Sequence, residues 1–541
     1  MRSLRVWAVV GMCVCSAVAL SVSQSKCRKT KVLVLGAGIT GITAAKTLTE
    51  NGLDDFIILE YQDRVGGRAI STNFGQKADG SPYVVELGAN WIQGLQTEDG
   101  PENPIWALTK QYKVSNTFSD FDSIETFDET GPVDYTSLFD DLDSAWVEAE
   151  QDAGYILREN LLDRSFRSGL SLGGWKPRRQ LPGVRPSHAQ AAEWWYFDFE
   201  YAFSPEASSQ QYSVVNYNTT FYRFSEENNF VWDQRGISAM VEEEADSFLG
   251  QDDPRLLLNS IITNITYTPK GVTVHTTNDI CFQAQYAICS FSLGVLQNDA
   301  VSFSPPLPSW KQTAIETFQM GTYTKIFLQF PPDQVFWNTS TQFFLYASPN
   351  ERGWYPVFQS LDHEDFHPGS GILFATVVSD QAHRAEAQDD EVTKDEIMAV
   401  LRQMYPNTTI PEPIDFMYPR WSTTPWSYGS YSNWPVGVTL KSHQNLRANL
   451  DRLYFAGEAG HPQFFGFLHG GYFEGKEIGE RVAGCVISRG KNCTDMARYE
   501  RTTGTTEFEE YHAEHGWDVD SFEVAGAVAS DSLNLTVAKN L

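Results

Sequence analysis

A glycine-rich turn near the start of the chain has the spacing of a phosphate-binding site. Residues 36–41 read Gly-Ala-Gly-Ile-Thr-Gly. In such a turn the first glycine permits a tight bend, the second lets the backbone approach a pyrophosphate, and the third lets a helix pack closely on the preceding strand. The helix N-terminus then offers its unpaired N–H groups and positive dipole end to the phosphates. Gly36, Gly38 and Gly41 are therefore candidate dinucleotide-binding residues.

The segments on either side supply the elements that this turn requires. Residues 31–35 and 56–59 are short apolar runs of the kind found in buried parallel strands. Glu60 follows the second run, about 20 residues beyond Gly41, where a carboxylate accepts hydrogen bonds from the ribose hydroxyl groups. An acidic residue here favours FAD or NAD over NADP, because it repels a 2′-phosphate. The sequence predicts a βαβ unit that binds FAD or NAD.

Further motifs, in a fixed order along the chain, carry a family resemblance. They occupy residues 64–68, 86–91, 291–297, 321–327, 429–437 and 453–472. Together they resemble the flavin amine oxidase superfamily, and the later ones are similar to its polyamine oxidase branch, which includes secreted FAD enzymes. The resemblance runs from about residue 31 to about 485 and implies that the cofactor is FAD. It also implies a non-covalent flavin, because Ser430 stands where some relatives have the cysteine that forms the flavin linkage.

The resemblance implies an α/β fold of two interleaved domains. A Rossmann-type FAD-binding domain would comprise residues 28–110, 230–310 and 430–500, and an α+β substrate-binding domain residues 111–229 and 311–429, as in the architecture shared with p-hydroxybenzoate hydroxylase. The length of 541 residues also favours more than one domain. Residues 501–541 match nothing in the family, and their acidic composition predicts a solvated tail. Beyond the glycines and Glu60, the cofactor contacts implied are Arg68, Ile261, Trp434 and Glu458.

Three residues are candidates for the chemistry. Alternation along a predicted strand puts Tyr323 and Lys325 on one face, although a lysine in such a strand can also extend its amine to solvent. In the family the matching lysine hydrogen-bonds a water at flavin N5, and burial lowers its pKa so that it can transfer protons near neutral pH. Tyr431 and Tyr472 match two aromatic positions that flank the amine. Lys325, Tyr431 and Tyr472 are the predicted catalytic residues.

The implied reaction is oxidation of an amine. A hydride passes from the carbon beside the neutral amine to flavin N5, water hydrolyses the resulting imine, and O2 reoxidises the flavin and leaves as hydrogen peroxide. Plant-type polyamine oxidases carry a glutamate where this chain has Gln93, so one charge contact to a distal ammonium is absent, and Glu200 is the candidate for the other. With Tyr323, these are the predicted substrate contacts. A polyamine is the expected substrate, and a monoamine or an alkaloid-type secondary amine is the alternative.

Other classes of protein fit the sequence less well. An L-amino acid oxidase needs a cation for the substrate carboxylate, and no arginine replaces the two tyrosines. A secreted FAD-binding protein without turnover would have no use for Lys325 and the tyrosines together. A nicotinamide dehydrogenase would have no role for residues 64–68 or 457–458. The formal charge of -29 disfavours nucleic acid as a partner and suits cationic small molecules, and the oligomeric state is left open.

The N-terminus predicts export. Arg2 and Arg5 precede an apolar run over residues 7–20 that is short for a membrane span, so residues 1–24 are a predicted signal peptide and an uncleaved anchor is the alternative. The protein is then expected to be secreted without a membrane anchor. Six sequons predict glycosylation, at Asn218, Asn264, Asn338, Asn407, Asn492 and Asn534.

The cysteines are few for this length. Those that remain after removal of residues 1–24 are Cys27, Cys281, Cys289, Cys485 and Cys493. An odd number leaves at least one thiol without an intramolecular partner, and the pairing is open, although Cys485 and Cys493 are near each other in the chain. No spacing of His and Cys resembles a zinc site, so no metal is expected.

Overall fold

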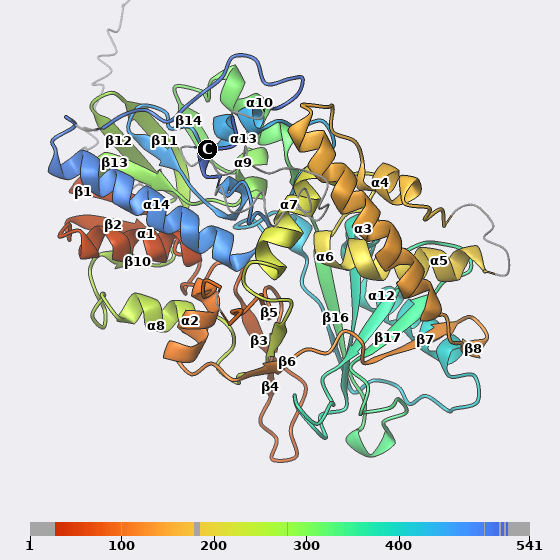
Figure 1. The fold of residues 1–541 in the computed structure, drawn as a ribbon. Coiled ribbons are helices and arrows are strands. Elements are labelled where there is room, and N and C mark those ends of the chain that lie inside the picture. Colours follow the sequence, from red (N-terminus) through yellow and green to blue (C-terminus); the bar gives the residue numbers. More distant parts are fainter. Residues whose placement is uncertain are drawn as a thin grey trace, which may run out of the picture.

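Two sheets organise the chain, as the α/β interpretation predicts. The structure, a computed structural model, describes residues 27–98, 100–177, 184–278, 280–491, 493–507, 510–512 and 515–517, and the predicted signal peptide lies outside them. Figure 1 shows one sheet with β1, β2 and β13 beside helices α1 and α14, and the other with β16 and β17 beside helices α3 and α12. None of the described helices is long and apolar enough to cross a membrane.

The first sheet has a parallel centre. Within the described residues its strands are, in spatial order, β10 (Leu256–Leu257), β2 (Phe56–Leu59), β1 (Arg28–Leu35), β13 (Cys281–Cys289), β12 (Gly271–Thr276), β11 (Ile262–Thr268) and β14 (Ser302–Ser304), with β22 (Leu453–Phe455) also paired to β13. The pairs β1–β2, β1–β13 and β13–β22 are parallel. The carboxyl ends of these strands therefore meet at one edge, which is where doubly wound sheets bind dinucleotides.

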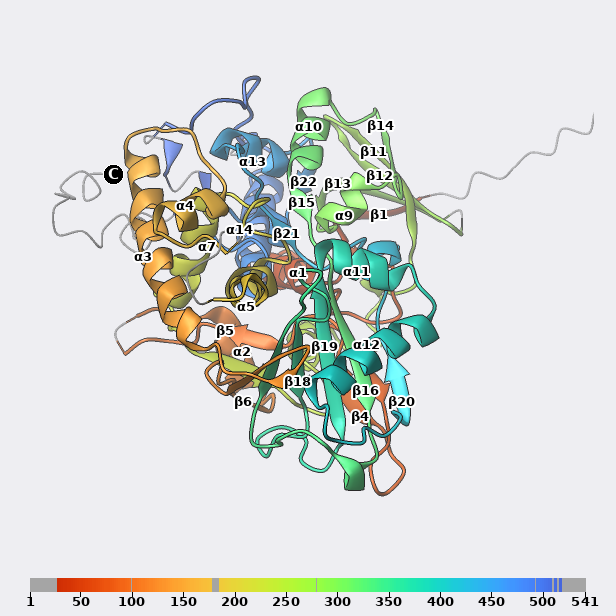
Figure 2. The same ribbon diagram turned by 90° about the vertical axis from the view of Figure 1, so that its right-hand side faces the viewer.

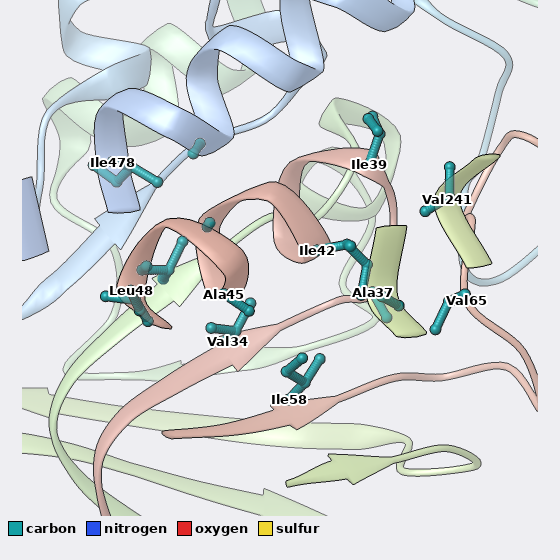
Figure 3. Close-up of a cluster of buried hydrophobic side chains, with 14 of the residues drawn as sticks. Val34, Ala37, Ile39, Ile42, Ala45, Leu48, Ile58, Val65, Val241 and Ile478 are labelled. Carbon is teal, nitrogen blue, oxygen red and sulfur yellow. The ribbon is translucent and has the colours of Figure 1, made fainter. Parts of the chain in front are cut away.

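Two helices pack against each other on this sheet. They are α1 (Ile39–Glu50), which follows β1 directly, and α14 (Leu468–Ile487), which comes from the other end of the sequence. Figure 3 shows Ile42, Leu48 and Ile478 among the side chains buried around α1, between the sheet and α14. Gly475 allows the close approach, because a Cβ there would lie 2.4 Å from the carbonyl oxygen of Thr40. The two ends of the sequence thus share one hydrophobic core.

The second sheet is mixed and is built from residues predicted to belong to the substrate-binding domain. In spatial order its described strands are β20 (Asp415–Met417), β16 (Tyr323–Gln329), β19 (Ile372–Val378), β18 (Val357–Ser360), β17 (Phe343–Ala347), β7 (Ile124–Asp128) and β8 (Gly131–Pro132). The β16 strand is buried along its whole length. Its neighbours β19 and β20 are both antiparallel to it. Both faces of this strand are therefore covered.

Smaller elements connect and cover the sheets, and Figure 2 shows α5 and α7 beside α3 and α4. The short strands are β3 (Ser71–Phe74), β4 (Tyr83–Glu86), β5 (Trp91–Gln93), β6 (Asn116–Phe118), β9 (Asn228–Val231), β15 (Gln319–Met320) and β21 (Ser432–Asn433). The remaining α-helices are α2 (Pro104–Gln111), α3 (Ser137–Arg158), α4 (Phe166–Leu172), α5 (Pro186–Glu193), α6 (Phe199–Tyr201), α7 (Gln210–Phe221), α8 (Ala239–Asp246), α9 (Leu293–Gln297), α10 (Ser309–Thr317), α11 (Ser379–Glu386), α12 (Asp390–Met404) and α13 (Leu440–Arg447). A π-helix occupies Trp194–Asp198, and short 3-10 helices occupy Pro332–Gln334, Trp421–Thr423 and Glu458–Gly460.

The C-terminal segment corrects one expectation. A solvated tail was predicted after residue 500, but Tyr511 and Trp517 are fully buried. The Tyr511 hydroxyl lies 3.3 Å from the Tyr212 hydroxyl of α7, and Lys441 of α13 forms an ion pair with Glu510. The described part of the tail therefore joins α7 to α13. Acidic composition misled the prediction because the aromatic residues within the segment decide its burial.

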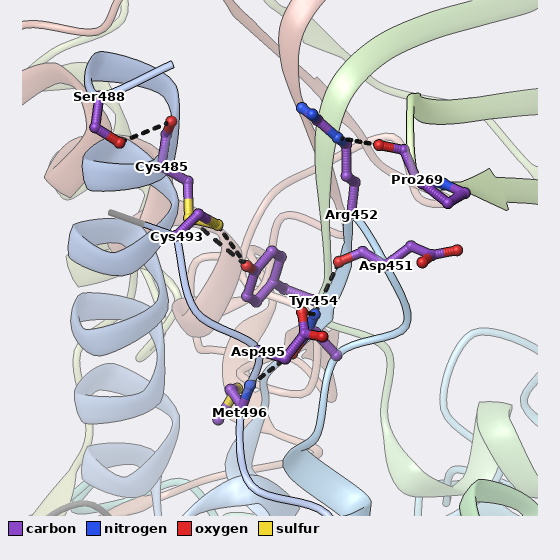
Figure 4. Close-up of a disulfide and its surroundings, with 10 residues drawn as sticks. Pro269, Asp451, Arg452, Tyr454, Cys485, Ser488, Cys493, Asp495 and Met496 are labelled. Atoms are coloured by element: carbon purple, nitrogen blue, oxygen red, sulfur yellow. Dashed lines mark hydrogen bonds between the residues drawn. A yellow bond between two sulfur atoms is a disulfide. The ribbon is translucent and has the colours of Figure 1, made fainter. Parts of the chain in front are cut away.

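The five described cysteines form two disulfides and leave one free thiol. Cys27 is bonded to Cys281 and Cys485 to Cys493, while Cys289 is a buried free thiol. Figure 4 shows the second disulfide beside Tyr454, whose hydroxyl lies 3.1 Å from the Cys493 sulfur. The prediction that at least one of these five cysteines has no intramolecular partner is confirmed.

The predicted glycosylation sites differ in accessibility. Asn338 and Asn407 are exposed and Asn264 is partly buried, whereas Asn492 and Asn534 lie outside the described residues. Asn218 lies within α7 with its side-chain amide completely buried. A sugar on that nitrogen has no room in the folded protein, so the prediction for Asn218 is wrong.

Candidate active site

One cavity of about 450 Å³ joins the two sheets. On the first sheet it is lined by the turn after β1, by Glu60, and by residues 66–69 and 260–262. On the substrate side Phe199, Glu200 and Tyr323 line it. Residues 430–432 and 465–468 complete the wall. Most of the predicted cofactor contacts and all three predicted substrate contacts are thus brought into one continuous space.

The glycine turn adopts a geometry that only glycine allows. Gly36 has φ +105°, in the region that side-chain-bearing residues avoid. A Cβ at Gly41 would lie 2.0 Å from the carbonyl oxygen of Gly36, so Gly41 does not line the cavity but lets α1 start directly behind the turn. Gly38 is the N-cap of α1 and lines the cavity. It has no side chain that could accept hydrogen bonds from the first N–H groups of the helix. These groups remain available to an anion.

Glu60 lies at the end of β2 with its carboxylate facing the same turn. Its two oxygens accept hydrogen bonds from the backbone N–H groups of Ala37, at 2.6 Å, and Gln62, at 2.9 Å. Burial raises the pKa of Glu60, and these hydrogen bonds and the nearby Arg64 oppose that shift. Each carboxylate oxygen keeps a second lone pair for a hydroxyl donor. Ser260 and Ile261 line the cavity beside it.

The loop after Glu60 brings a second stretch of backbone close to the glycine turn. Gly66 pairs with Gly38 in an isolated bridge, and a Cβ at Gly67 would lie 3.1 Å from the Gly38 Cα. Arg64 holds this loop by donating to the carbonyls of Gly67, at 2.7 Å, and Ala69, at 3.0 Å. The two glycine segments together form a narrow cradle of backbone.

Arg68 and Glu458 form an ion pair in the cavity wall. Nη1 of Arg68 lies 2.9 Å from Oε2 of Glu458 and also donates to the Ser430 carbonyl. The other oxygen of Glu458 accepts from the N–H groups of Ser432, at 2.7 Å, and Gly466, at 2.9 Å. The pair therefore ties together three segments distant in sequence. Ser432 was not singled out from the sequence, although it lies inside the 429–437 motif.

Lys325 is buried on β16, which excludes a solvent-exposed lysine. Its Nζ donates to Oδ1 of Asn90 at 2.9 Å and lies 5.7 Å from the Trp91 ring centroid. Burial lowers the pKa of Lys325, and the buried carboxylate of Glu86 partly opposes that shift. Asn90 and Trp91 line the cavity, whereas Lys325 lies directly behind them. The lysine is thus held beside the cavity wall, where a water molecule could carry a proton between it and the cavity.

The predicted substrate contacts meet opposite this wall. Nε2 of Gln93 donates to Oε1 of Glu200 at 3.0 Å, and both side chains line the cavity. Burial raises the pKa of Glu200 to about 7, and the hydrogen bond from Gln93 opposes the shift. Tyr431 donates its hydroxyl to the backbone carbonyl of Glu200 at 2.8 Å, and its ring lies 6.0 Å from that of Tyr323. One carboxyl group therefore stands among aromatic rings.

Tyr472 is not part of this group, and the prediction for it is wrong. It is absent from the cavity lining and packs against the core around α1. Burial raises the pKa of Tyr472, and the charges of Glu244 and Glu50 add to the shift. Phe467, just before α14 begins, lines the cavity instead. The four-residue spacing of Gly471, Gly475 and Gly479 could have shown which face of α14 meets α1.

Trp434 also lies outside the cavity. It is fully buried, and its ring stacks on Phe465 with a centroid distance of 5.2 Å. Phe465 lines the cavity, so Trp434 supports the wall rather than contacting a ligand within it. Among the predicted cofactor contacts, Gly36, Gly38, Glu60, Arg68, Ile261 and Glu458 all line the cavity.

Comparison with known proteins identifies the family. The model of the flavin-containing amine oxidoreductases matches residues 39–483. This chain belongs to that family. The chain is 38% identical over 472 residues to polyamine oxidase 1 of Zea mays, covering 84% of this chain and 91% of the relative. It is also 38% identical to polyamine oxidase 7 of Oryza sativa subsp. japonica, covering 82% and 93%.

Solved structures of the same fold agree. Putrescine oxidase bound to putrescine superimposes with a TM-score of 0.62 at 16% sequence identity, over 85% of this chain and 99% of that one. The flavin amine oxidase fold, its FAD cofactor and its amine oxidase activity are therefore established for this chain, as the sequence motifs predicted.

The residues of the cavity fit FAD. The uncapped start of α1 and the glycine cradle suit the pyrophosphate, and the Glu60 carboxylate suits the ribose hydroxyls. When bound, FAD supplies a two-electron acceptor for a hydride from the carbon beside an amine nitrogen. The protein's own part is to hold that carbon in place, to keep water away and to move the amine proton.

Proposed function

We propose that this amine oxidase acts on a diamine or polyamine, with O2 as the final electron acceptor. The amine, O2 and water would become an aldehyde, a released amine or ammonia, and hydrogen peroxide. The observation that carries the proposal is Glu200, a carboxyl group that lines the cavity beside Gln93 and among the rings of Tyr323 and Tyr431. An anionic Glu200 would hold a distal ammonium while the reacting amine lies between Tyr431 and Phe467.

A buried lysine that can accept a proton supports the same reaction. Lys325 has a lowered pKa because of burial, so its neutral form exists near neutral pH and can accept a proton from the reacting amine. Its hydrogen bond to Asn90 holds the lysine amine in place beside the cavity wall. The aromatic walls would keep water out during the oxidation.

The charge of the cavity disfavours an amino acid substrate. Among its described lining residues, Arg68 is the one with a permanent positive charge, and Glu458 already neutralises it. A substrate carboxylate would therefore meet Glu200 without a compensating cation. Since Gln93 is neutral, a monoamine or a cyclic secondary amine is the second candidate, because a single carboxyl group can be left protonated.

A peroxide-coupled assay on the FAD-loaded protein tests the proposal. The panel is putrescine, spermidine, spermine, N-acetylated polyamines, simple monoamines, cyclic amines and L-amino acids. Turnover of polyamines is expected, and Glu200→Gln is expected to raise their KM by about tenfold to a hundredfold, since a charge-assisted contact is lost. Gln93→Glu is the matched variant that adds a carboxyl group at the same place. Turnover confined to monoamines or cyclic amines, with no effect of Glu200→Gln, would contradict the proposal.

We also propose that the protein is secreted and glycosylated. The predicted signal peptide, the two disulfides and the exposed sequons at Asn338 and Asn407 support this. Expression in a secretory host should give a protein in the medium that starts near residue 25 and loses mass on enzymatic deglycosylation. Retention in the cell with residues 1–24 attached would contradict export.

A further inference from the structure

A π-helical turn presents Glu200 to the cavity. The helix α5 ends at Glu193, the π-helix covers Trp194–Asp198, and α6 follows at once with Phe199 and Glu200. A π-turn inserts one residue relative to an α-helix and so rotates everything after it. Phe199 and Glu200, the two residues after it, both line the cavity. The direction of the Glu200 side chain therefore depends on the π-turn being kept.

One guanidinium group holds both ends of this turn. Arg352, in the loop between β17 and β18, donates from Nη1 to Oδ2 of Asp198 at 2.5 Å and from Nη2 to Oδ1 at 2.7 Å. The same Nη2 lies 3.3 Å from Oε1 of Glu193. Glu193 and Asp198 flank the π-turn, and both are buried. Arg352 thus links Glu193, the residue just before the π-turn, to Asp198, its last residue.

The buried carboxylate of Asp198 depends on this arginine. Burial raises the pKa of Asp198, and Arg352 is the main group that lowers it. Glu193 has further partners, since it accepts from Nε1 of Trp175 at 2.9 Å and is paired with Arg167. Without Arg352, Asp198 would be a charge without compensation in the interior, and the turn would rearrange or take up a proton.

The network of Arg352, Glu193 and Asp198 influences the cavity without lining it. Among the described residues, Glu193, Asp198 and Arg352 do not belong to its lining. The Glu200 carbonyl accepts the Tyr431 hydroxyl at 2.8 Å, which anchors the α6 backbone to the cavity wall, so loss of the network would mainly redirect the Glu200 side chain. A change in this network should therefore alter how an amine is held without removing any group that touches it.

We propose that Arg352 is a positioning residue for substrate recognition: by bridging Glu193 and Asp198 across the π-turn, it fixes the Glu200 carboxyl group toward the distal ammonium of the substrate. The inference rests on the proposed role of Glu200 in binding a distal ammonium. It assigns to Arg352 a role in KM for polyamines rather than in the chemical step.

A double-mutant cycle tests the assignment on the FAD-loaded enzyme. Arg352→Met, Glu200→Gln and the combined variant are compared with the parent for KM and kcat on spermidine and on a monoamine. Arg352→Met is expected to raise the KM for spermidine about tenfold or more, with a small change in kcat and in the monoamine KM. In the Glu200→Gln background it should add less than about twofold, because the group that it positions is gone. Arg352→Lys should recover part of the loss.

Controls separate positioning from general damage. Arg384→Met removes another arginine of the substrate domain, paired with Glu396 at 2.7 Å, and should leave the spermidine KM unchanged. If Arg352→Met does not accumulate as folded protein, Asp198→Asn removes the same charge pair with little change in shape and enters the same cycle. Additive effects in the combined variant, or equal losses for both substrates, would overturn the inference. An unchanged KM for Glu200→Gln alone would instead overturn the proposed function and this inference with it.

Discussion

Replacing Lys325 with methionine tests the chemistry most directly. Methionine has a similar length and is apolar, so it fills the buried space on β16 without a cation. The change removes the hydrogen bond from Nζ to Asn90, which costs about 1–3 kcal/mol of folding free energy if the Asn90 oxygen stays unpaired. Because Lys325 lies behind the cavity lining, FAD should bind as before.

The kinetic effect should be much larger than the effect on stability. Positioned acid–base groups contribute about 100-fold to 10,000-fold, or about 3–5 kcal/mol of activation free energy. The measurement is the rate of flavin bleaching after anaerobic mixing with spermidine in a stopped-flow instrument. In the parent enzyme this rate should rise with pH through the lowered pKa of Lys325, since the neutral amine is the proton acceptor. The variant should lose that part of the pH profile.

A second buried lysine provides the control. Lys311 donates its amine to the carbonyls of Leu446 and Ala448 and does not line the cavity. Lys311→Met should lower the melting temperature and leave the bleaching rate of the folded enzyme unchanged. A bleaching rate for Lys325→Met within about threefold of the parent would refute the role assigned to Lys325.

Three further predictions follow from the packing and from the pKa of Glu200. Gly41→Ala should abolish FAD retention because its Cβ would lie 2.0 Å from the Gly36 carbonyl oxygen, whereas Gly250→Ala, with open space around it, should retain FAD; equal flavin content in the two purified variants would contradict this. In steady-state assays Phe467→Ala should lower kcat/KM for amines by about tenfold or more, while Tyr472→Phe should leave it unchanged. The reverse result would show that Tyr472, and not Phe467, contacts the amine. The KM for polyamines should rise as pH falls through about 7, where Glu200 takes up a proton and loses its charge, and a pH series in which Glu200→Gln keeps this dependence would disprove the link.

Residues close together in the chain were predicted well. The turn at residues 36–41 and Glu60 lie in one βαβ unit, whose geometry follows from local spacing, so their places in the site could be read before any tertiary contact was known. Lys325 and Tyr431 were found through motifs whose order along the chain matches a family. The strand that carries Lys325 also alternates as expected, although burial on both faces could not be read from one strand alone.

The failures concern side chains whose direction is set by distant partners. Tyr472 points to the α1 side because α14 packs through glycines against the other end of the sequence, and that contact rotates the next residue away from the cavity. Trp434 lies behind Phe465, and Tyr511 and Trp517 of the described part of the tail are buried in the core that also holds residues of α7 and α13.

The sequence by itself determined the family and the cofactor, since these depend on residue types at local spacings and on motifs in a fixed order. The tertiary structure alone decided which rings line the cavity, which partner fixes Lys325, and how Arg352 reaches Asp198 across 154 positions of the chain. The physical reason is that the orientation of a side chain depends on the packing of its whole element, and that packing is a contact between segments that no local pattern encodes.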